Sequence, residues 1–286
     1  MHIKDIFKEK TVFSFEVFPP KKTSSIDVIY RTLDELHDLK PDFISVTFSA
    51  GGSGNSNLAC DIASKIKDNG ITPMIHLPCI NYTKDEISST LDEIKSRGIE
   101  NILALRGDIN PDIPPKREFL HASDLITYIK SQGDFDIAGA CYPECHPDAD
   151  SLVDDIINLR KKVDAGADHL ITQLFFDNDL FYEFREKAAI AGINVPIEAG
   201  IMPVVNKKQI ERMVTGCGAS LPGKFVKIMQ RYEHNPEALR DAGIAYAVNQ
   251  IVDLVASGVD GIHLYTMNNA YVARKITEAV SGILGA

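Results

Sequence analysis

The sequence lacks several features that would each point to a particular class of protein. It has only five cysteines in 286 residues, an odd number that does not make the disulfide framework of a small secreted domain. Basic residues are also few relative to acidic ones: 30 lysines and arginines against 40 acidic residues give a net charge of -10, which argues against a nucleic-acid partner. No apolar run approaches membrane-spanning length, and the N-terminal residues lack the apolar core of a signal peptide. We therefore expect a cytoplasmic globular protein.

Several sequence motifs of catalysis and cofactor binding are also missing. No G-x-G-x-x-G follows the first predicted strand, and there is no G-x-S-x-G elbow of a serine hydrolase. The glycine-rich stretch 51–54 lacks the lysine and the Ser/Thr pair of a phosphate-binding P-loop, so we expect a loop there. Cys141, Cys145 and His146 do not have the spacing of a standard zinc site. The sequence therefore predicts no metal.

What the sequence does have is a regular alternation of strands and helices. Apolar segments rich in β-branched and aromatic residues predict strands at 11–18, 43–47, 73–77, 101–108, 136–142, 169–173, 196–199 and 261–265. Segments with helical spacing of apolar residues lie between them, at about 26–36, 57–70, 83–98, 122–132, 152–166, 178–192, 206–232 (with a break near 216–223), 235–258 and from 270 onward. Residues 83–86 form a capping box, and Asn235-Pro236 is a cap followed by a first-turn proline.

The junctions between these elements repeat. A glycine follows a helix and comes just before a strand at Gly70, Gly98, Gly166, Gly192 and Gly258. Eight strand-then-helix units at about thirty-residue spacing are what a (β/α)8 TIM barrel requires, and no linker divides them. We therefore predict an α/β protein with one domain, residues 1–286, folded as a (β/α)8 barrel. A doubly wound open sheet is the alternative, weakened by the missing G-x-G-x-x-G.

A barrel of this kind carries its chemistry at the C-terminal ends of the strands, and nearly every predicted strand here ends in a polar or titratable group. These groups are Glu16, Thr47, His76, Arg106 with Asp108, Tyr142 with Glu144 and His146, Gln173, and His263 with Tyr265. The opposite strand ends carry mostly glycine, asparagine and aspartate of turn type. The pattern predicts a large polar pocket at one end of the barrel.

Two carboxylates in unlike surroundings would suit acid and base roles at this pocket. Glu16 stands among apolar residues, so a buried Glu16 should have a raised pKa and could donate a proton near neutral pH. Asp108, beside Arg106, should stay ionised. The loop 142–147 displays an aromatic ring and an imidazole. The helix after it carries polar side chains that could serve a large anionic cofactor: Asp155, Asn158, Lys161 and Lys162.

Motifs spread over essentially the whole chain resemble the methylenetetrahydrofolate reductase family. They are FEVFPP at 15–20, SVT at 45–47, LRGD at 105–108, YPECHP at 142–147, ITQLFFD at 171–177 and GIMP at 200–203. The resemblance implies a flavoprotein barrel that reduces 5,10-methylenetetrahydrofolate to 5-methyltetrahydrofolate by ping-pong hydride transfer through FAD, in one-carbon metabolism and methionine biosynthesis. The chain resembles the short bacterial form, which consists of the catalytic barrel alone.

The resemblance also assigns roles to positions of this chain. Glu16 matches the general acid that helps open the imidazolidine ring, and Asp108 matches an aspartate near both the flavin and the pterin. Gln173 and Gln209 match folate-binding glutamines. Positions that match the lining of the FAD site are Thr47, His76, Arg106, Gly107, Asp108, Ala122, Tyr142, His146, Asp155, Asn158, Lys161 and Lys162.

The chain departs from the family's pattern at two positions. Asn269 stands where well-studied members have an arginine, and Met213 where they have a stacking phenylalanine; either change could accompany a different electron donor. NADH, NADPH, or a ferredoxin or flavoprotein partner with accessory subunits are the candidate donors, and a homo-oligomer is expected. The alternatives are a pterin-binding methyltransferase barrel without redox chemistry, another FAD-dependent barrel oxidoreductase, and a non-catalytic binding module.

Overall fold

The computed structural model describes residues 1–20, 23–48, 56–109, 114–206, 211, 214 and 216–285. Its parallel strands are β1 (Val12–Val17), β2 (Phe43–Val46), β3 (Thr72–Pro78), β4 (Asn101–Leu105), β5 (Asp136–Cys141), β6 (His169–Thr172), β7 (Ile197–Ile201) and β8 (Gly261–Tyr265). Each strand pairs with its neighbours in sequence, and β8 pairs with β1, so the sheet closes into a barrel. The predicted (β/α)8 barrel is confirmed.

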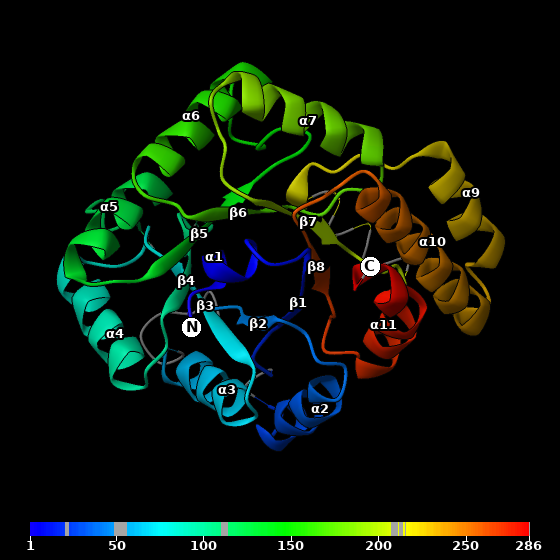
Figure 1. The fold of residues 1–286 in the computed structure, drawn as a ribbon, viewed down its shortest axis with the longest axis horizontal. Coiled ribbons are helices and arrows are strands. Elements are labelled where there is room, and N and C mark those ends of the chain that lie inside the picture. The colour runs from blue at the N-terminus through cyan, green and yellow to red at the C-terminus, as the bar shows by residue number, and fades with distance from the viewer. Residues whose placement is uncertain are drawn as a thin grey trace.

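The helices form a ring outside the strands, as Figure 1 shows. They are α2 (Asp27–His37), α3 (Ser56–Asp68), α4 (Lys84–Ser96), α5 (Ala122–Gln132), α6 (Leu152–Asp164), α7 (Asn178–Ile190), α9 (Gly223–Tyr232), α10 (Pro236–Ala256) and α11 (Ala270–Leu284). The capping box at Thr83 and the Asn235 cap before Pro236 both form as predicted. None of the helices described is long and apolar enough to cross a membrane.

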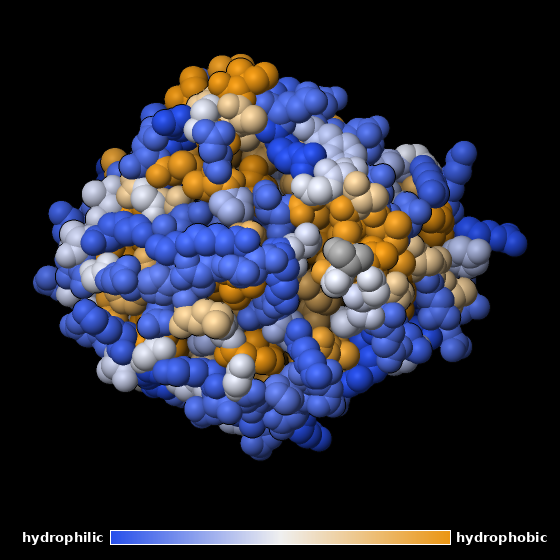
Figure 2. All heavy atoms as spheres, viewed as in Figure 1, coloured by the Kyte–Doolittle hydropathy of each residue, from blue (hydrophilic) through white to orange (hydrophobic). Residues whose placement is uncertain are grey.

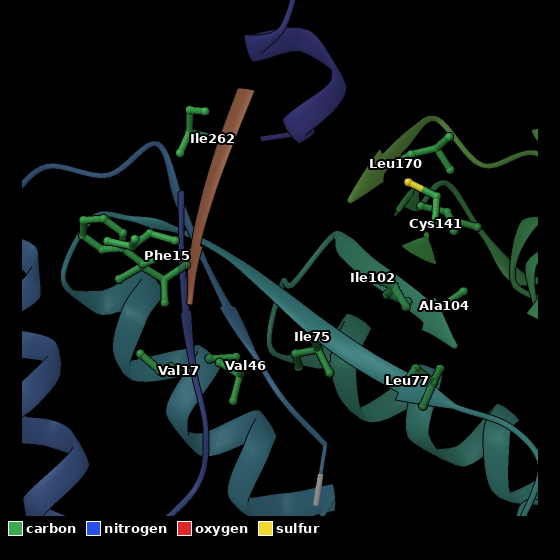
Figure 3. Close-up of a cluster of buried hydrophobic side chains, with 14 of the residues drawn as sticks. Phe15, Val17, Val46, Ile75, Leu77, Ile102, Ala104, Cys141, Leu170 and Ile262 are labelled. Atoms are coloured by element: carbon green, nitrogen blue, oxygen red, sulfur yellow. The ribbon is translucent and has the colours of Figure 1, made fainter. Parts of the chain in front are cut away.

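Strand alternation divides each strand between two environments. On β1, Phe15 and Val17 belong to the main apolar core, where Figure 3 shows them with Val46, Ile75 and Leu77 between the strands and the helices. Burying such a side chain fully contributes roughly 1.5–3 kcal/mol, so this layer stabilises the barrel. The intervening residues of β1, Ser14 and Glu16, face the barrel interior because successive side chains point to opposite faces.

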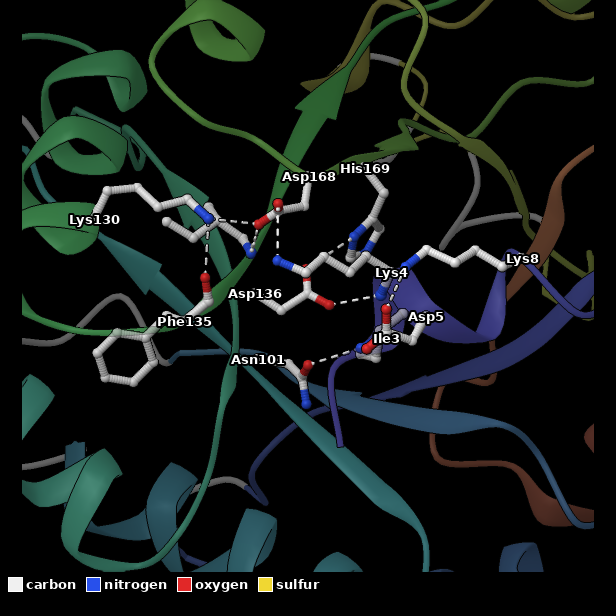
Figure 4. Close-up of polar contacts among 11 residues, drawn as sticks. Ile3, Lys4, Asp5, Lys8, Asn101, Lys130, Phe135, Asp136, Asp168 and His169 are labelled. Carbon is white, nitrogen blue, oxygen red and sulfur yellow. Dashed lines mark hydrogen bonds and ion pairs between the residues drawn. The ribbon is translucent and has the colours of Figure 1, made fainter.

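An additional short helix, α1 (Ile3–Ile6), is held at the N-terminal ends of the strands by a polar cluster (Figure 4). Asn101 accepts a hydrogen bond from the backbone N–H of Ile3 at 3.0 Å, and Asp136 accepts one from Lys4 at 2.6 Å. Asp168 forms ion pairs with Lys4 and with Lys130. From sequence, the polar residues at this end were taken to be mostly of turn type; Asn101 and Asp136 differ, since they are buried and hold α1 against the barrel.

Some predicted bounds differ from the structure. The strand predicted at 101–108 ends at Leu105, so Arg106, Gly107 and Asp108 lie in the loop that follows. Of the long helix predicted at 206–232, α9 is the C-terminal part, and much of the remainder is outside the described residues, as is the predicted loop 49–54.

Seen along the barrel (Figure 2), the surface is largely hydrophilic, with separate hydrophobic patches near α6 and α7 and near the C-terminus.

Candidate active site

The C-terminal ends of the strands surround a cavity of about 780 Å³. It is lined by every described residue to which the family resemblance assigns a role: Glu16, Thr47, His76, Arg106, Gly107, Asp108, Ala122, Tyr142, His146, Asp155, Asn158, Lys161, Lys162 and Gln173. Gln209 and Met213 lie outside the described residues. The structure therefore brings the predicted residues to one cavity, while the role of each stays a prediction.

Glu16 stands at the interior side of β1 beside two imidazoles. Its Oε2 lies 3.6 Å from Nε2 of His76 on β3 and 3.8 Å from Nε2 of His263 on β8. Burial, opposed by the charge of Glu16, lowers the pKa of His76 to about 4, so this imidazole is neutral at pH 7. The Glu16 side chain is 19% exposed, so the fully buried carboxylate that we considered from sequence is not what the structure shows. It opens onto the cavity instead.

His263 was predicted at a strand end, and this was wrong. It lies in the middle of β8, fully buried inside the barrel, with its ring stacked on Phe43 at 5.8 Å between centroids. Tyr265, two residues on, does line the cavity, and its hydroxyl donates to the backbone oxygen of Thr172 at 2.6 Å. Burial and the charge of Glu16 raise the pKa of Tyr265 well above its usual value, so it acts there as a neutral donor.

The loop after β4 is shaped by Gly107. Its φ of 86° is in the left-handed region, and an added Cβ would stand 2.9 Å from Cβ of Pro78, so the backbone passes close to β3. Arg106 turns toward Asp148 and forms an ion pair with it at 2.7 Å. Asp108, which the sequence placed beside Arg106, is exposed.

The loop after β5 presents the predicted ring pair. Tyr142 and His146 lie edge to face with centroids 4.6 Å apart. Asp155 on α6 accepts a hydrogen bond from the backbone N–H of His146 at 2.9 Å, which fixes the loop against the helix. Burial raises the pKa of Tyr142 to about 12, and burial together with Arg106 lowers the pKa of His146. Both rings are therefore neutral at pH 7.

The two lysines of α6 have different settings. Lys161 is exposed and donates to Oδ1 of Asn158 at 2.9 Å, whereas Lys162 reaches under the cavity and donates to the backbone oxygen of Ala140 at 2.7 Å. Burial lowers the pKa of Lys162. Arg106, Lys161 and Lys162 all line the cavity and supply cationic groups that an anionic ligand could use, beside the carboxylates Asp148 and Asp155 of the same lining.

Among the residues described, no group of three or more His, Cys, Asp and Glu side chains is placed to hold a metal ion; Cys141 is buried in the core, and the thiol of Cys145 contacts the backbone oxygen of His146.

Glu198, a fully buried carboxylate on β7, was missed in the sequence analysis. Its signal was a glutamate inside a short apolar strand, at a position that strand alternation places on the barrel's inner face.

A closed (β/α)8 barrel with titratable groups gathered at the C-terminal ends of its strands is the architecture of an enzyme. The sequence model of methylenetetrahydrofolate reductase matches residues 2–281. The 5,10-methylenetetrahydrofolate reductase of Escherichia coli is 38% identical over 93% of this chain and 90% of its own length, and that of Buchnera aphidicola is 36% identical over 94% and 91%. The chain therefore belongs to the methylenetetrahydrofolate reductase family.

Other relatives set the limits of the comparison. Methylenetetrahydrofolate reductase (NADH) 1 of Arabidopsis thaliana is 38% identical over 93% of this chain, but the match spans only 48% of that protein. Among solved structures, an uncharacterized protein from Clostridium thermocellum that binds two copies of 5-methyl-5,6,7,8-tetrahydrofolic acid has a TM-score of 0.75 over 99% of this chain and 98% of its own. At 15% identity, this second likeness concerns the fold alone.

Proposed function

We propose that this protein catalyses the flavin-dependent reduction of 5,10-methylenetetrahydrofolate to 5-methyltetrahydrofolate. The observation that carries the proposal is Glu16, a carboxylate that faces two imidazoles in a cavity whose lining includes Arg106 and Lys162. Membership of the family and the high coverage of the bacterial relatives support the same reaction. The reaction belongs to one-carbon metabolism and supplies the methyl group for methionine biosynthesis.

Glu16 is the proposed general acid. Opening the five-membered ring of the folate breaks a carbon–nitrogen bond, and the leaving nitrogen needs a proton from a positioned group. Glu16 is the carboxyl that opens onto the cavity from the barrel interior, and its neighbour His76 is neutral, so it does not compete as a charged partner. After donation, the remaining carboxylate faces Nε2 of two imidazoles, either of which can stabilise it when protonated at that nitrogen.

We propose FAD as the cofactor that binds in this cavity. FAD, when bound, carries the hydride between the electron donor and the folate. Two buried polar atoms of the cavity lining, Nε2 of His76 and Oδ1 of Asn81, have no hydrogen-bond partner within the described chain, which suits them to contacts with a ligand. Arg106, Lys161 and Lys162 would hold the diphosphate, because guanidinium and ammonium groups bind phosphate oxygens strongly.

The folate and the electron donor are proposed to bind in turn. Both must reach the same cofactor, and the opposite end of the barrel is filled by α1, so access is from the C-terminal side. We propose that Asp108 and Gln173 contact the folate there, with Asp108 also close to the flavin. An Asp108→Asn substitution should then slow the reaction with folate. It should leave the thermal unfolding midpoint of the protein unchanged, because Asp108 is exposed. A lower yield of folded protein would instead make Asp108 structural.

We propose NADH as the first electron donor to test, because the Arabidopsis relative is named for it. A ferredoxin or a flavoprotein partner is the alternative donor. Asn269 stands where well-studied family members have an arginine. It caps α11 by accepting a hydrogen bond from the backbone N–H of Val272 at 3.2 Å. This cap uses only the amide oxygen; a substrate carboxylate would need the Nδ2–H donors, which do not offer the planar two-pronged grip of an arginine guanidinium.

The visible spectrum of the purified protein tests the function. We expect an oxidised flavin spectrum that anaerobic NADH bleaches and methylenetetrahydrofolate restores, with 5-methyltetrahydrofolate as the product. Restoration by folate after chemical reduction, but no bleaching by NADH, would keep the reductase activity and replace the donor. A protein that takes up no FAD and binds no folate would overturn the proposal. Binding of a pterin without any flavin would favour the methyltransferase alternative.

A further inference from the structure

A second carboxylate, Glu198, lies deeper in the barrel than Glu16. On β8, Glu198 is level with Gly261, whereas Glu16 is level with Tyr265 at the other end of that strand. Gly261 makes room for it, because an added Cβ would stand 2.7 Å from Cγ of Glu198. The side chain is fully buried, and burial raises its pKa well above the usual value. Glu198 is therefore a neutral carboxylic acid near pH 7, and one of its two oxygens carries a proton that can be donated in a hydrogen bond.

Glu198 is connected to Glu16 by two other buried side chains. Oγ of Ser14 lies 2.9 Å from Oε1 of Glu198 and 2.6 Å from Nδ1 of His263. Nε2 of His263 lies 3.8 Å from Oε2 of Glu16. Ser14, His263 and Glu198 have no exposed surface, so water does not compete for these contacts. The four residues form a line of polar atoms that leads from the barrel interior to the cavity.

Counting protons gives this line a direction. The Ser14 hydroxyl has one proton, two close partners and a more distant one, the backbone oxygen of Ile262 at 3.4 Å, so it can donate to only one of them. Oε2 of Glu198 has no hydrogen-bond partner among the described residues, and a buried unpaired O–H is costly, so the acid proton belongs on Oε1, where it can donate to Ser14. Ser14 then donates to Nδ1 of His263. A neutral imidazole that accepts at Nδ1 carries its proton on Nε2.

We propose that Glu198 is a positioning residue for Glu16, acting through Ser14 to hold His263 in the tautomer whose Nε2–H faces the Glu16 carboxylate. That N–H stabilises the ion left when Glu16 gives up a proton, so it makes Glu16 a stronger acid. An ionised Glu198 would have the opposite effect. It would accept a hydrogen bond from the Ser14 hydroxyl, and His263 would then have to carry its proton on Nδ1 in order to donate to Ser14. The catalytic part of this inference rests on the function proposed above, and the tautomer does not.

The surroundings keep the line in this state. The charged groups that act on Glu198 are Asp42 and Asp260, and both disfavour a second negative charge beside them. Around Glu16, the titratable neighbours are His76, His263 and Tyr265, from β3 and β8. Ser45 on β2 lies 3.4 Å from Nε2 of His263, and the stacked ring of Phe43 limits rotation of the imidazole.

The tautomer can be observed directly by ¹⁵N NMR of the protein labelled at its histidines, with the His263 signals assigned from their loss in His263→Gln. In the wild type, we expect Nδ1 of His263 to resonate as an unprotonated acceptor and Nε2 as protonated. Glu198→Gln should preserve this pattern, since the amide also donates to Ser14. Glu198→Leu should replace this pattern with a mixture of the two neutral tautomers of His263. Nδ1–H or a doubly protonated ring in the wild type would overturn the proposal, as would an unchanged tautomer in folded Glu198→Leu.

A pH profile then separates a positioning role from a structural one. Glu198→Leu and Ser14→Ala should each raise the pH midpoint of the folate reaction by about half a pH unit, the effect of losing an N–H dipole that faces the carboxylate at 3.8 Å. The double variant should show no larger shift, because both substitutions break the same line. Additive shifts, or a lower rate with an unmoved midpoint, would contradict the positioning role. The NMR result needs neither flavin nor folate, so failure of the reductase proposal would leave it standing.

Discussion

The buried His76 makes a quantitative prediction about stability. Its pKa falls from 6.5 to about 4 in the folded protein, chiefly through burial. Between these two values, the unfolded chain binds more protons than the folded chain, so the free energy of unfolding rises with pH. The stability that a neutral His76 provides is fully present above pH 6.5 and is lost as the pH falls toward the folded value. At about 1.36 kcal/mol per pH unit, the loss by pH 4 is about 3 kcal/mol.

The perturbation that tests this magnitude is His76→Gln, which keeps a polar side chain but cannot titrate. Urea unfolding of the wild type and the variant should be compared between about pH 7 and about pH 4. Other groups change the stability of both proteins, so only the difference between them is informative. We expect the wild type to lose about 3 kcal/mol more than the variant over this range.

A matched control is Ile75→Val, a buried change on the same strand that removes a methylene and no titratable group. It should lower the free energy of unfolding by about 1 kcal/mol at every pH, so that its curve runs parallel to the wild type. A His76→Gln curve that is also parallel to the wild type would refute the reasoning. It would mean that His76 becomes charged in the folded protein, and that Glu16 faces an imidazolium.

Three further predictions follow from single contacts. Tyr265→Phe should lower the free energy of unfolding by about 1–3 kcal/mol, since it leaves the buried carbonyl of Thr172 without its donor; calorimetry would contradict this by showing no change. Lys162→Met should weaken FAD binding about tenfold in a fluorescence titration, whereas the exposed control Lys187→Met should not; equal affinities would remove Lys162 from the cofactor site. Asn101→Ala should loosen α1 and speed proteolysis near the N-terminus, and unchanged cleavage would show that the other contacts suffice.

The architecture could be predicted from the sequence because its signals are local. Apolar strand segments, helix caps such as Thr83 and the glycines between helices and strands each depend on a few neighbouring residues, and they all agreed on one fold. Strand ends were also predictable, and they led to the cavity. The end of β4 was misplaced, since Leu105-Arg106 reads as a continuing strand until Gly107 turns the backbone.

The contacts made across the barrel could not be predicted. The partner of Arg106 is Asp148, far along the chain, and periodicity says nothing of such a pairing. The same holds for the polar cluster under α1 and for Glu198, whose neighbours Ser14 and His263 come from other strands. Strand alternation places Glu198 on the inner face of the barrel, but only closure of the sheet decides which side chains it contacts there. The family resemblance supplied site residues, but it did not supply their hydrogen bonds.

The central claim is that Glu16 acts as the acid in folate reduction, and a single-turnover experiment tests it most directly. Protein whose flavin has been reduced photochemically is mixed anaerobically with methylenetetrahydrofolate, and the return of the oxidised spectrum is timed for the wild type and for Glu16→Gln. We predict rapid reoxidation with formation of 5-methyltetrahydrofolate in the wild type, and a rate at least about 100-fold lower in the variant, with flavin still bound. Equal rates in the two proteins would contradict the assignment of Glu16.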